Sequence, residues 1–438
     1  MKSPAGRPDT EVDTKRDKNL AYLAQVIYSQ RRTRTTNRTF MRTFERTHPW
    51  ISFVCDLGKA GAELWLALGE AASKCEHISR VPLRPATAQA LHQLYLAKGA
   101  AATTAIEGNT LSEAEVLQAV EGRLVVPPSK QYLKQEVENV IAACNGIGRQ
   151  LTEGMLPTLS AEFLCGYNRQ VLEKLPVKDD VKPGELRTHS VVVGNVYRGA
   201  PAEDCRYLID RLCEWLNGSE FQAPENAATG MDTVYAILRA VVAHLYLAWI
   251  HPFGDGNGRT ARLVEFHILL SAGVPSPAAH LFSNHYNQTR TEYYRQLDLA
   301  SKSGGDIVPF IGYAVRGFVD GLREQLEKIW TQQWDVVWRN FVHERFQNRN
   351  SPTDTRQRHL ALDLGDGEDW VEVGKVTELT PRLAKAYAGK TSKTVQRDLN
   401  GLVEMDLIAR DGRRVRARRE IILAFLPLRK KSGAPAKS

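Results

Sequence analysis

The segment His251-Pro-Phe-Gly-Asp-Gly-Asn-Gly-Arg-Thr-Ala-Arg262 gathers groups that suit phosphate chemistry. His251 is the side chain in this segment whose ordinary pKa allows it to accept a proton near neutral pH. Gly256 and Gly258 have no Cβ atom, so a phosphate can approach their backbone amides closely. The segment therefore combines a candidate general base with a candidate anion cradle.

The same segment carries two cations and a carboxylate. Arg259 and Arg262 are three residues apart, so in a helical turn they lie on one face and can both reach anionic oxygens. Asp255 is an oxygen ligand of the kind that Mg²⁺ takes beside phosphate groups. A base, a metal ligand, an anion cradle and two arginines in one short stretch have no comparable structural explanation.

Two helices are needed to position these groups. Before the segment, apolar residues from Val234 to Leu245 recur at i, i+3 and i+4, which predicts a helix that is buried in a protein core. After it, a second helix should open near Gly258 and run to about Ser271, where Gly273 and Pro275 provide stop signals. The loop then lies at a helix N-terminus, where free amides and the helix dipole favour anions.

The sequence HPFGDGNGRTAR resembles the Fic family motif, HPFx[D/E]GNGRxxR, at every fixed position. The resemblance extends over roughly residues 50–335. It implies a mainly α fold, with a helical core and a β-hairpin flap. It also implies transfer of AMP from ATP, with Mg²⁺, to a Ser, Thr or Tyr hydroxyl of a target protein. The implied roles are general base for His251, Mg²⁺ ligand for Asp255, binding of the α- and β-phosphates for Gly256, Asn257 and Gly258, and binding of the outer phosphates for Arg259 and Arg262.

A second segment places a carboxylate where a helix should end. Residues 103–109 read TTAIEGN, and Gly108 is suited to a left-handed C-cap, so Glu107 lies at the negative end of a helix dipole and calls for a cationic partner. Thr110-Leu-Ser-Glu113 then predicts a capping box for the next helix. Thr103, Glu107 and Gly108 are similar to the family's inhibitory motif, [S/T]xxxE[G/N]. The resemblance implies autoinhibition through a Glu107–Arg262 pair.

A β-hairpin is predicted at 188–199, THSVVVGNVYRG, because a β-branched run meets Gly194-Asn195 and then resumes. It resembles the family's flap, on which an extended target segment would dock. The candidate docking residues are Val191, Val192, Val193 and Tyr197.

The C-terminal part resembles a winged helix-turn-helix. Residues 391–402, TSKTVQRDLNGL, are similar to recognition helices common in bacterial regulators, and residues 410–419 place six arginines around an Asp-Gly turn. From residue 381 onward there are 15 Lys+Arg against 5 Asp+Glu, so a polyanion such as DNA is the expected partner. The candidate DNA contacts are Lys393, Gln396, Arg397, Arg413, Arg414 and Arg416. A winged helix that binds protein instead is a competing interpretation.

Composition and charge are those of a globular protein with several domains. Six cysteines without C-x-x-C spacing predict reduced thiols, and the polar, charged N-terminus has no signal-peptide pattern, so we expect a cytoplasmic protein without a membrane partner. A small α+β winged-helix domain should follow the helical core. The predicted boundaries are a flexible basic extension at 1–48, a helical region with the inhibitory helix at 49–125, the Fic core at 126–335, a linker at 336–368, the winged helix at 369–428 and a basic tail at 429–438.

Three functions remain open at this point. The chain could transfer AMP to proteins, it could remove AMP from modified proteins with Glu107 orienting the attacking water, or it could be a DNA-binding regulator or toxin-like switch that uses the core to sense nucleotide. A homodimer is expected from the family resemblance alone.

Overall fold

A computed structural model of the protein describes residues 41–155, 157–193, 197–367 and 369–422. The chain divides into two compact units, Met1–Pro49 and Trp50–Ser438. The described residues of the first unit contain one short helix, α2 (Thr43–Thr47). Most of the predicted extension at 1–48 and all of the predicted tail at 429–438 lie outside the described residues.

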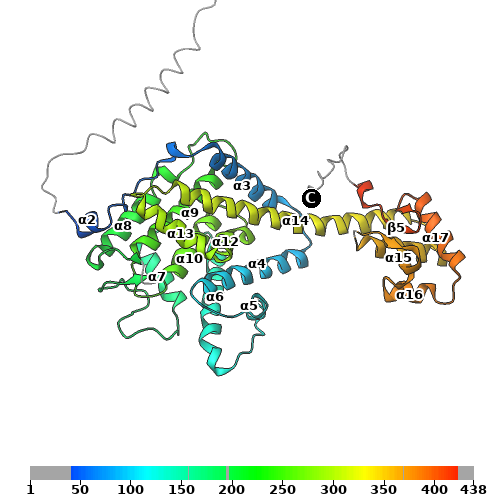
Figure 1. The fold of residues 1–438 in the computed structure, drawn as a ribbon, viewed down its shortest axis with the longest axis horizontal. Coiled ribbons are helices and arrows are strands. Elements are labelled where there is room, and N and C mark those ends of the chain that lie inside the picture. The colour runs from blue at the N-terminus through cyan, green and yellow to red at the C-terminus, as the bar shows by residue number, and fades with distance from the viewer. Residues whose placement is uncertain (1–40, 156, 194–196, 368, 423–438) are drawn as a thin grey trace, which may run out of the picture. The chain divides into compact units, whose positions relative to one another are not determined.

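From residue 50 to about 337 the second unit is almost entirely helical (Figure 1). The helices are α3 (Ala62–Arg80), α4 (Pro85–Ile106), α5 (Glu113–Val120), α6 (Gln131–Thr152), α7 (Ala161–Val171), α8 (Cys205–Leu216), α9 (Met231–Ile250), α10 (Asn257–Ser271), α11 (Ser276–Ala279), α12 (Leu281–Gln288), α13 (Arg290–Lys302) and α14 (Val308–Arg345). Short 3-10 turns occur at η1 (Leu57–Lys59), η2 (Pro128–Lys130), η3 (Ala202–Asp204) and η4 (Ser219–Phe221).

Helix α9 lies at the centre of this core and packs against α3, α8, α10 and α14. It is apolar on all sides, as a helix surrounded by other helices should be. Among the described residues it is the helix that is long and apolar enough to cross a membrane, and 78% of its most apolar window is buried inside the protein. Burial among neighbouring helices thus accounts for its composition, as the apolar spacing predicts.

A small antiparallel hairpin interrupts the helices and confirms the predicted one. Strand β1 (Val192–Val193) pairs with β2 (Tyr197–Arg198), with Val192 opposite Arg198 and Val193 opposite Tyr197. The predicted turn at Gly194-Asn195 lies outside the described residues.

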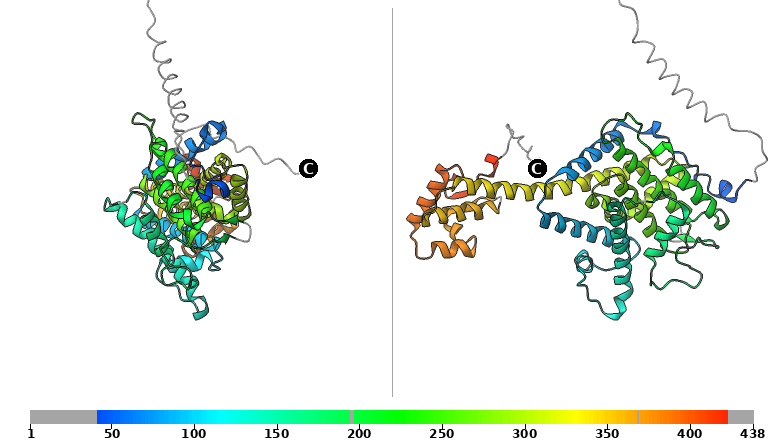
Figure 2. Two further views of the ribbon diagram at one scale, coloured as in Figure 1. Left: turned by 90° about the vertical axis from the view of Figure 1, so that its left-hand side faces the viewer. Right: turned by 180° about the vertical axis from the view of Figure 1, so that it is seen from behind.

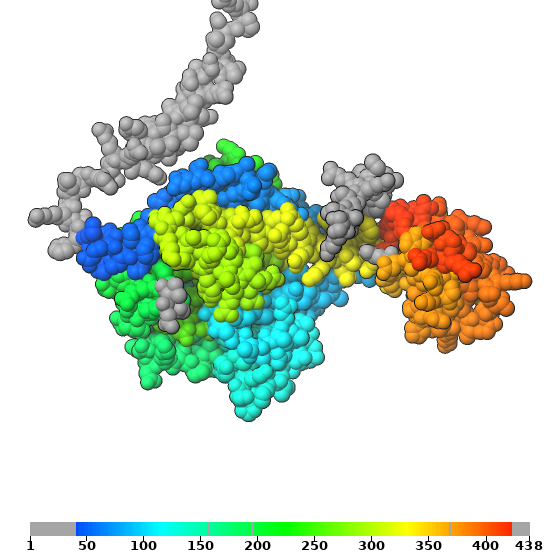
Figure 3. All heavy atoms as spheres, viewed as in Figure 1, coloured from blue at the N-terminus to red at the C-terminus, as the bar shows by residue number. Residues whose placement is uncertain are grey.

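The C-terminal part has its own hydrophobic core, which the end of α14 joins through Trp338 and Val342. Figure 2 shows α14 continuing into this part, and in Figure 3 the orange and red atoms gather into one lobe. Its elements are α15 (Pro352–Gly365), β3 (Val371–Glu372), η5 (Val373–Glu378), α16 (Pro381–Tyr387), α17 (Ser392–Glu404), β4 (Ile408–Asp411), β5 (Arg414–Ala417) and η6 (Arg419–Ile422). The strands form one antiparallel sheet in the order β3-β5-β4.

A buried ion pair lies inside this second core. Arg356 Nε donates to Asp398 Oδ2 at 2.7 Å, and the two side chains are 9% and 0% exposed. The Tyr387 hydroxyl donates to the same carboxylate oxygen at 3.1 Å. Asp398 therefore joins α15, α16 and α17, and the Asp of the predicted recognition helix has a structural contact inside the protein.

Residues 336–368, predicted to be a linker, are largely helical. Helix α14 continues to Arg345, and α15 follows after a short turn. The Ser351-Pro352 pair suggests a break, but Ser351 is the N-cap of α15, where its hydroxyl accepts from Asp354 N, and Pro352 occupies the first helical turn, where proline is well tolerated. The polar residues around Ser351, which suggest a linker, therefore belong to the start of α15.

Candidate active site

His251 ends helix α9 in a left-handed backbone conformation, with φ 51° and ψ 57°. Its backbone N–H donates to Leu247 O at 2.9 Å, so the last turn of α9 fixes the residue. Positive φ is uncommon for a residue with a side chain and is found at functional sites. Burial lowers the pKa of His251 from 6.5 to about 4, so its imidazole is uncharged at neutral pH and can accept a proton.

Arg187, which sequence reasoning missed, braces the backbone around His251. Its Nε donates to His251 O at 2.7 Å and its Nη1 to His189 O at 2.7 Å, while Nη2 donates to Ala200 O. Arg187 thereby joins the start of the flap, the end of the flap and the end of α9. Its neighbour Gly199 is needed for close packing, because a Cβ there would lie 2.9 Å from His251 Cβ.

Asn257 shapes the loop from inside. Its Oδ1 accepts from Phe253 N at 2.9 Å and its Nδ2 donates to Phe253 O at 2.8 Å, so both groups of the buried amide are used within the loop. The role that the resemblance gives to this side chain, contact with phosphate, therefore differs from what it does in this structure. Helix α10 starts at Asn257, one residue before the predicted start.

A second asparagine outside the motif supports the loop from α7. Asn168 Nδ2 donates to Asp255 O at 2.9 Å, and Gly184 N donates to Asn168 Oδ1 at 2.9 Å. Gly256, with φ +74°, turns the chain into α10 next to this asparagine. Nothing in the sequence around Asn168 distinguishes it from other asparagines in a helix.

Arg259 is buried and bridges two carboxylates. Its Nη1 donates to Glu136 Oε1 of α6 at 2.7 Å, and its Nη2 donates to Asp255 Oδ1 at 3.1 Å. The Asp255 side chain is 49% exposed, whereas Glu136 and Arg259 are 11% and 7% exposed. Sequence reasoning brought Arg259 and Asp255 together but missed Glu136.

Arg262 contacts the end of helix α4. Its Nη2 donates to Thr103 O at 2.9 Å and to Glu107 Oε1 at 2.5 Å. Burial alone would raise the pKa of Glu107, but the charge of Arg262 and its hydrogen bond outweigh this, so the pKa lies below its usual value and the carboxylate stays charged. The structure thus brings together the two residues that the inhibitory motif pairs.

Gly258 gives the Glu107 carboxylate its place. A Cβ on Gly258 would lie 2.2 Å from Glu107 Oε1 and 3.0 Å from Arg262 Nη1. An anionic oxygen therefore sits at the N-terminus of α10, against a residue without a side chain and in contact with an arginine. This is the site chemistry predicted for a phosphate, with a carboxylate standing in for the phosphate oxygens.

The end of α4 follows the predicted pattern only in part. Glu107 is the C-cap and Gly108 has φ +102°, as expected. The capping box of α5 is formed by Ser112 and Glu115, so the predicted Thr110–Glu113 box was wrong. The physical reason is a turn in which Asn109 Oδ1 accepts from Leu111 N at 3.0 Å, which delays the helix start.

The donor set fits a magnesium–nucleotide complex. Mg²⁺ is usually held by one or two carboxylates together with phosphate oxygens and water, and Asp255 offers a half-exposed carboxylate next to the anion position. The Nε atoms of Arg259 and Arg262 are buried without a partner in the described residues, which leaves donor capacity at the cradle. Asp255 is therefore the residue that would hold the metal, which would neutralise phosphate charge.

The flap is attached to the end of α9. The Tyr197 hydroxyl donates to Trp249 O at 2.8 Å, and Gly199 N donates to Val191 O at 3.2 Å. Val192 is 53% exposed, whereas Tyr197 is half-buried. Of the predicted docking residues, Val192 is thus exposed, whereas Tyr197 anchors the hairpin to α9.

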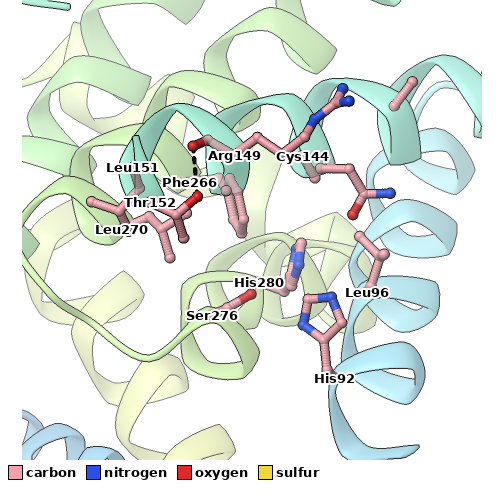
Figure 4. Close-up of a pocket in the computed structure, with 13 residues that line it drawn as sticks. His92, Leu96, Cys144, Arg149, Leu151, Thr152, Phe266, Leu270, Ser276 and His280 are labelled. Atoms are coloured by element: carbon pink, nitrogen blue, oxygen red, sulfur yellow. Dashed lines mark hydrogen bonds between the residues drawn. The ribbon is translucent and has the colours of Figure 1, made fainter. Parts of the chain in front are cut away.

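One groove in the helical core does not belong to the motif loop. It has a volume of about 710 Å³ and is lined by side chains of α4, α6 and α10, among them Leu96 and Phe266, and by His280, which lies between α11 and α12 (Figure 4). None of its lining residues lies within 251–262. The chemistry of the loop, rather than the size of a cavity, therefore locates the candidate site.

In the C-terminal part, the candidate DNA contacts separate into two groups. Lys393, Arg397, Arg413 and Arg414 are exposed, and no acidic partner contacts them in the described residues. Arg416 lies on the same outer face of β5 as Arg414, but it donates to both Glu420 oxygens at 2.9 Å and stacks over Trp370. Gln396 Oε1 accepts from Arg410 at 2.8 Å.

Comparison with known proteins fits this arrangement. Residues 158–269 match the Fic/DOC family. The chain is 31% identical over 235 residues to "Protein adenylyltransferase fic-1" of Caenorhabditis briggsae, covering 54% of this chain and 42% of that protein. It is 31% identical over 208 residues to "Protein adenylyltransferase Fic" of Drosophila mojavensis, covering 48% of this chain and 37% of that protein. The chain thus spans about two fifths of the length of these relatives.

A solved structure shows the same fold. The crystal structure of a Fic family protein from Desulfovibrio desulfuricans G20 aligns with a TM-score of 0.50 and 19% identity, over 82% of this chain and 97% of that one. The matched segment 158–269 contains the flap, His251, the anion cradle and both arginines. Residues 158–269 of this chain are therefore similar to the Fic/DOC family in sequence, and the wider helical fold is that of a solved Fic family protein.

Proposed function

We propose that this chain is a protein adenylyltransferase, which transfers AMP from ATP to a hydroxyl group of a target protein with the help of Mg²⁺. The observation that carries the proposal is that the loop from His251 to Arg262 holds an anionic oxygen, that of Glu107, between Gly258 and Arg262. The loop begins with a histidine that is uncharged at neutral pH. Its relatives of 31% identity are named protein adenylyltransferases, which supports this choice among phosphate reactions.

In the proposed reaction, His251 accepts the proton of the target hydroxyl. The hydroxyl oxygen then forms a bond to the α-phosphorus, and the bond from that phosphorus to the pyrophosphate oxygen breaks. Arg259, Arg262 and the amides at the start of α10 stabilise the negative charge on the phosphates and on the leaving pyrophosphate. Arg187 holds His251 in place, because four backbone carbonyls around it accept from this one guanidinium. Mg²⁺, held by Asp255, would supply charge neutralisation of the phosphates.

Glu107 acts as an inhibitor within this proposal. Its carboxylate occupies the position of a phosphate oxygen and uses the Arg262 donor that the nucleotide needs. A charged carboxylate and a phosphate in the same place repel each other, so nucleotide binds productively only when Glu107 leaves. Within this proposal, the chain is autoinhibited as long as Glu107 occupies that position.

The target would dock on the flap. Among the described residues this sheet consists of β1 and β2, so another strand would add at the second edge of β1, beside the exposed Val192. An extended target segment that adds to this edge receives main-chain hydrogen bonds independent of its sequence. Tyr197 anchors the hairpin to the last turn of α9, close to His251 in the chain.

The test uses the Glu107→Gly chain, in which the inhibitory carboxylate is missing. It is incubated with a bacterial lysate and with ATP labelled either at the α- or at the γ-phosphorus. AMP transfer labels protein from α-labelled ATP only. Label from γ-labelled ATP would show phosphoryl transfer and refute the proposal. Absence of label from both, together with AMP release from a previously modified protein, would identify the hydrolase instead.

A second role, DNA binding, concerns the C-terminal part. We infer that α15, β3, α16, α17, β4 and β5 form a winged helix-turn-helix, since their order is helix, strand, two helices and a two-stranded wing. The supporting observation is the set of exposed cations that have no acidic partner among the described residues. Arg413 and Arg414 line a groove of about 670 Å³, and Lys393 and Arg397 line another of about 650 Å³. Salt-dependent binding to duplex DNA tests this role.

A further inference from the structure

Glu136 of α6 contacts the motif arginine that Glu107 does not engage. Its Oε1 accepts from Arg259 Nη1 at 2.7 Å, and both side chains are nearly buried. Breaking a buried ion pair is costly because the remaining charge stays desolvated. This contact therefore fixes one edge of the Arg259 guanidinium.

The other edge of Arg259 is held much more loosely. Its Nη2 lies 3.1 Å from Asp255 Oδ1, and the Asp255 side chain is 49% exposed. Ion pairs with such exposure contribute little, since water screens them. Arg259 can thus exchange its Asp255 contact for another anion while it keeps Glu136.

Asn109 in turn fixes the Glu136 carboxylate. Its Nδ2 donates to Glu136 Oε2 at 2.8 Å and to Leu133 O at 2.9 Å, and the residue is buried. One Glu136 oxygen is therefore bound by Asn109 and the other by Arg259. With both oxygens assigned, the carboxylate has one orientation, and so does the guanidinium that it holds.

We propose that Glu136 is a positioning residue, which orients Arg259 so that its Nη2 edge can exchange Asp255 for a phosphate oxygen of the nucleotide. The inference rests on the proposed function, because it assumes that the loop binds ATP. The end of α4 then contacts both arginines, Arg262 directly through Glu107 and Arg259 through Asn109 and Glu136. Glu136 supports binding, whereas Glu107 opposes it.

The test measures binding of a fluorescent ATP analogue to the Glu107→Gly chain and to the same chain with Glu136→Gln. Loss of one charge-assisted hydrogen bond should weaken binding about tenfold. In transfer assays KM for ATP should rise by a similar factor with little change in kcat. The matched control is Glu138→Gln on the same helix, where an exposed glutamate lies 3.7 Å from Lys134, and it should bind the analogue normally.

A double-mutant cycle separates positioning from general damage. In a Glu107→Gly/Arg259→Gln chain, Glu136→Gln should cause no further loss of affinity, because the residue acts through Arg259. A further loss of the same size would overturn the inference. It would also be overturned if Arg259→Gln, made in the Glu107→Gly chain, left the affinity for the analogue unchanged. If Glu136→Gln does not fold, Asn109→Ala, which leaves the ion pair in place, should weaken binding in the same direction, and unchanged binding would overturn the inference.

The experiment distinguishes failure of the proposed function from failure of the role of Glu136 alone. If the Glu107→Gly chain binds no ATP analogue at all, the proposed function fails and the inference fails with it. If it binds the analogue and Glu136→Gln binds equally well, only the role of Glu136 is refuted.

Discussion

Glu107 Oε1 lies 2.5 Å from Arg262 Nη2, and it is so close to Gly258 that a Cβ on that residue would lie 2.2 Å from the same oxygen. The end of one helix thereby places a negative charge at the positive end of another. Under the proposed function, this contact would make the loop self-regulating, because the donors that bind the carboxylate are those that would bind the phosphate.

Removing the charge of Glu107 should raise the affinity for ATP. Glu107→Gln keeps the size of the side chain but not its charge, and Glu107→Gly removes both, so we expect at least about tenfold tighter binding, with Gly tighter than Gln. Titration of a fluorescent ATP analogue measures this. Glu113→Gln, at an exposed carboxylate 4.0 Å from Lys98, is the control. Equal affinity in all four chains, wild type included, would show that Glu107 does not occupy the phosphate position.

The pH dependence of transfer should reflect the low pKa of His251. A general base works in its unprotonated form, and a pKa of about 4 keeps His251 unprotonated throughout pH 5–8. For the Glu107→Gly chain, kcat/KM should therefore fall on the acid side only as pH approaches about 4. Tryptophan fluorescence at each pH confirms that the chain is folded. An acid limb near 6.5 would mean that His251 titrates as an ordinary, exposed histidine.

The buried Arg356–Asp398 pair should dominate the stability of the C-terminal part. Asp398→Asn leaves Arg356 without its counter-charge inside the core and should cost about 3–5 kcal/mol in the free energy of unfolding. Denaturant unfolding followed by tryptophan fluorescence measures the loss. Asp406→Asn, which breaks an exposed pair with Arg418, should cost less than about 1 kcal/mol. Equal losses would contradict the structural role of Asp398.

Binding to DNA should depend on the unpaired cations and not on the paired ones. Replacing Lys393 and Arg397, or Arg413 and Arg414, by glutamine should weaken binding to a mixed-sequence duplex and lower the slope of log affinity against log salt by about one per lost phosphate contact. Replacing Arg416 and Arg418 together by glutamine also removes two charges, but Glu420 and Asp406 already engage them, so this variant should have a smaller effect. No salt-dependent binding by the wild-type chain would favour a protein partner.

The candidate loop was recognisable in the sequence because its residues are contiguous. His251 and Arg262 lie within one short segment, so the candidate base, the glycines and the arginines can be recognised together without knowledge of the fold. Glu107 was predictable for a different reason. A carboxylate before a glycine at a helix end is locally unfavourable, and this points to a cation elsewhere.

The supporting residues were not predictable from sequence. Glu136, Asn168 and Arg187 come from three separate segments and are ordinary residue types in ordinary surroundings. Their roles arise only when α6, α7 and the flap pack around the loop. The residue types of Asn257 and Arg416 suggest contacts with phosphate groups. In the structure their polar atoms instead form hydrogen bonds with the Phe253 backbone and the Glu420 carboxylate.

The most direct test of the account compares three chains: wild type, Glu107→Gly, and Glu107→Gly with His251→Ala. Each is incubated with Mg²⁺, ATP labelled at the α-phosphorus and a bacterial lysate. We predict weak labelling of protein by the wild type, strong labelling by Glu107→Gly and none by the double variant. Equal labelling with and without His251, or no gain on removal of Glu107, would contradict the account.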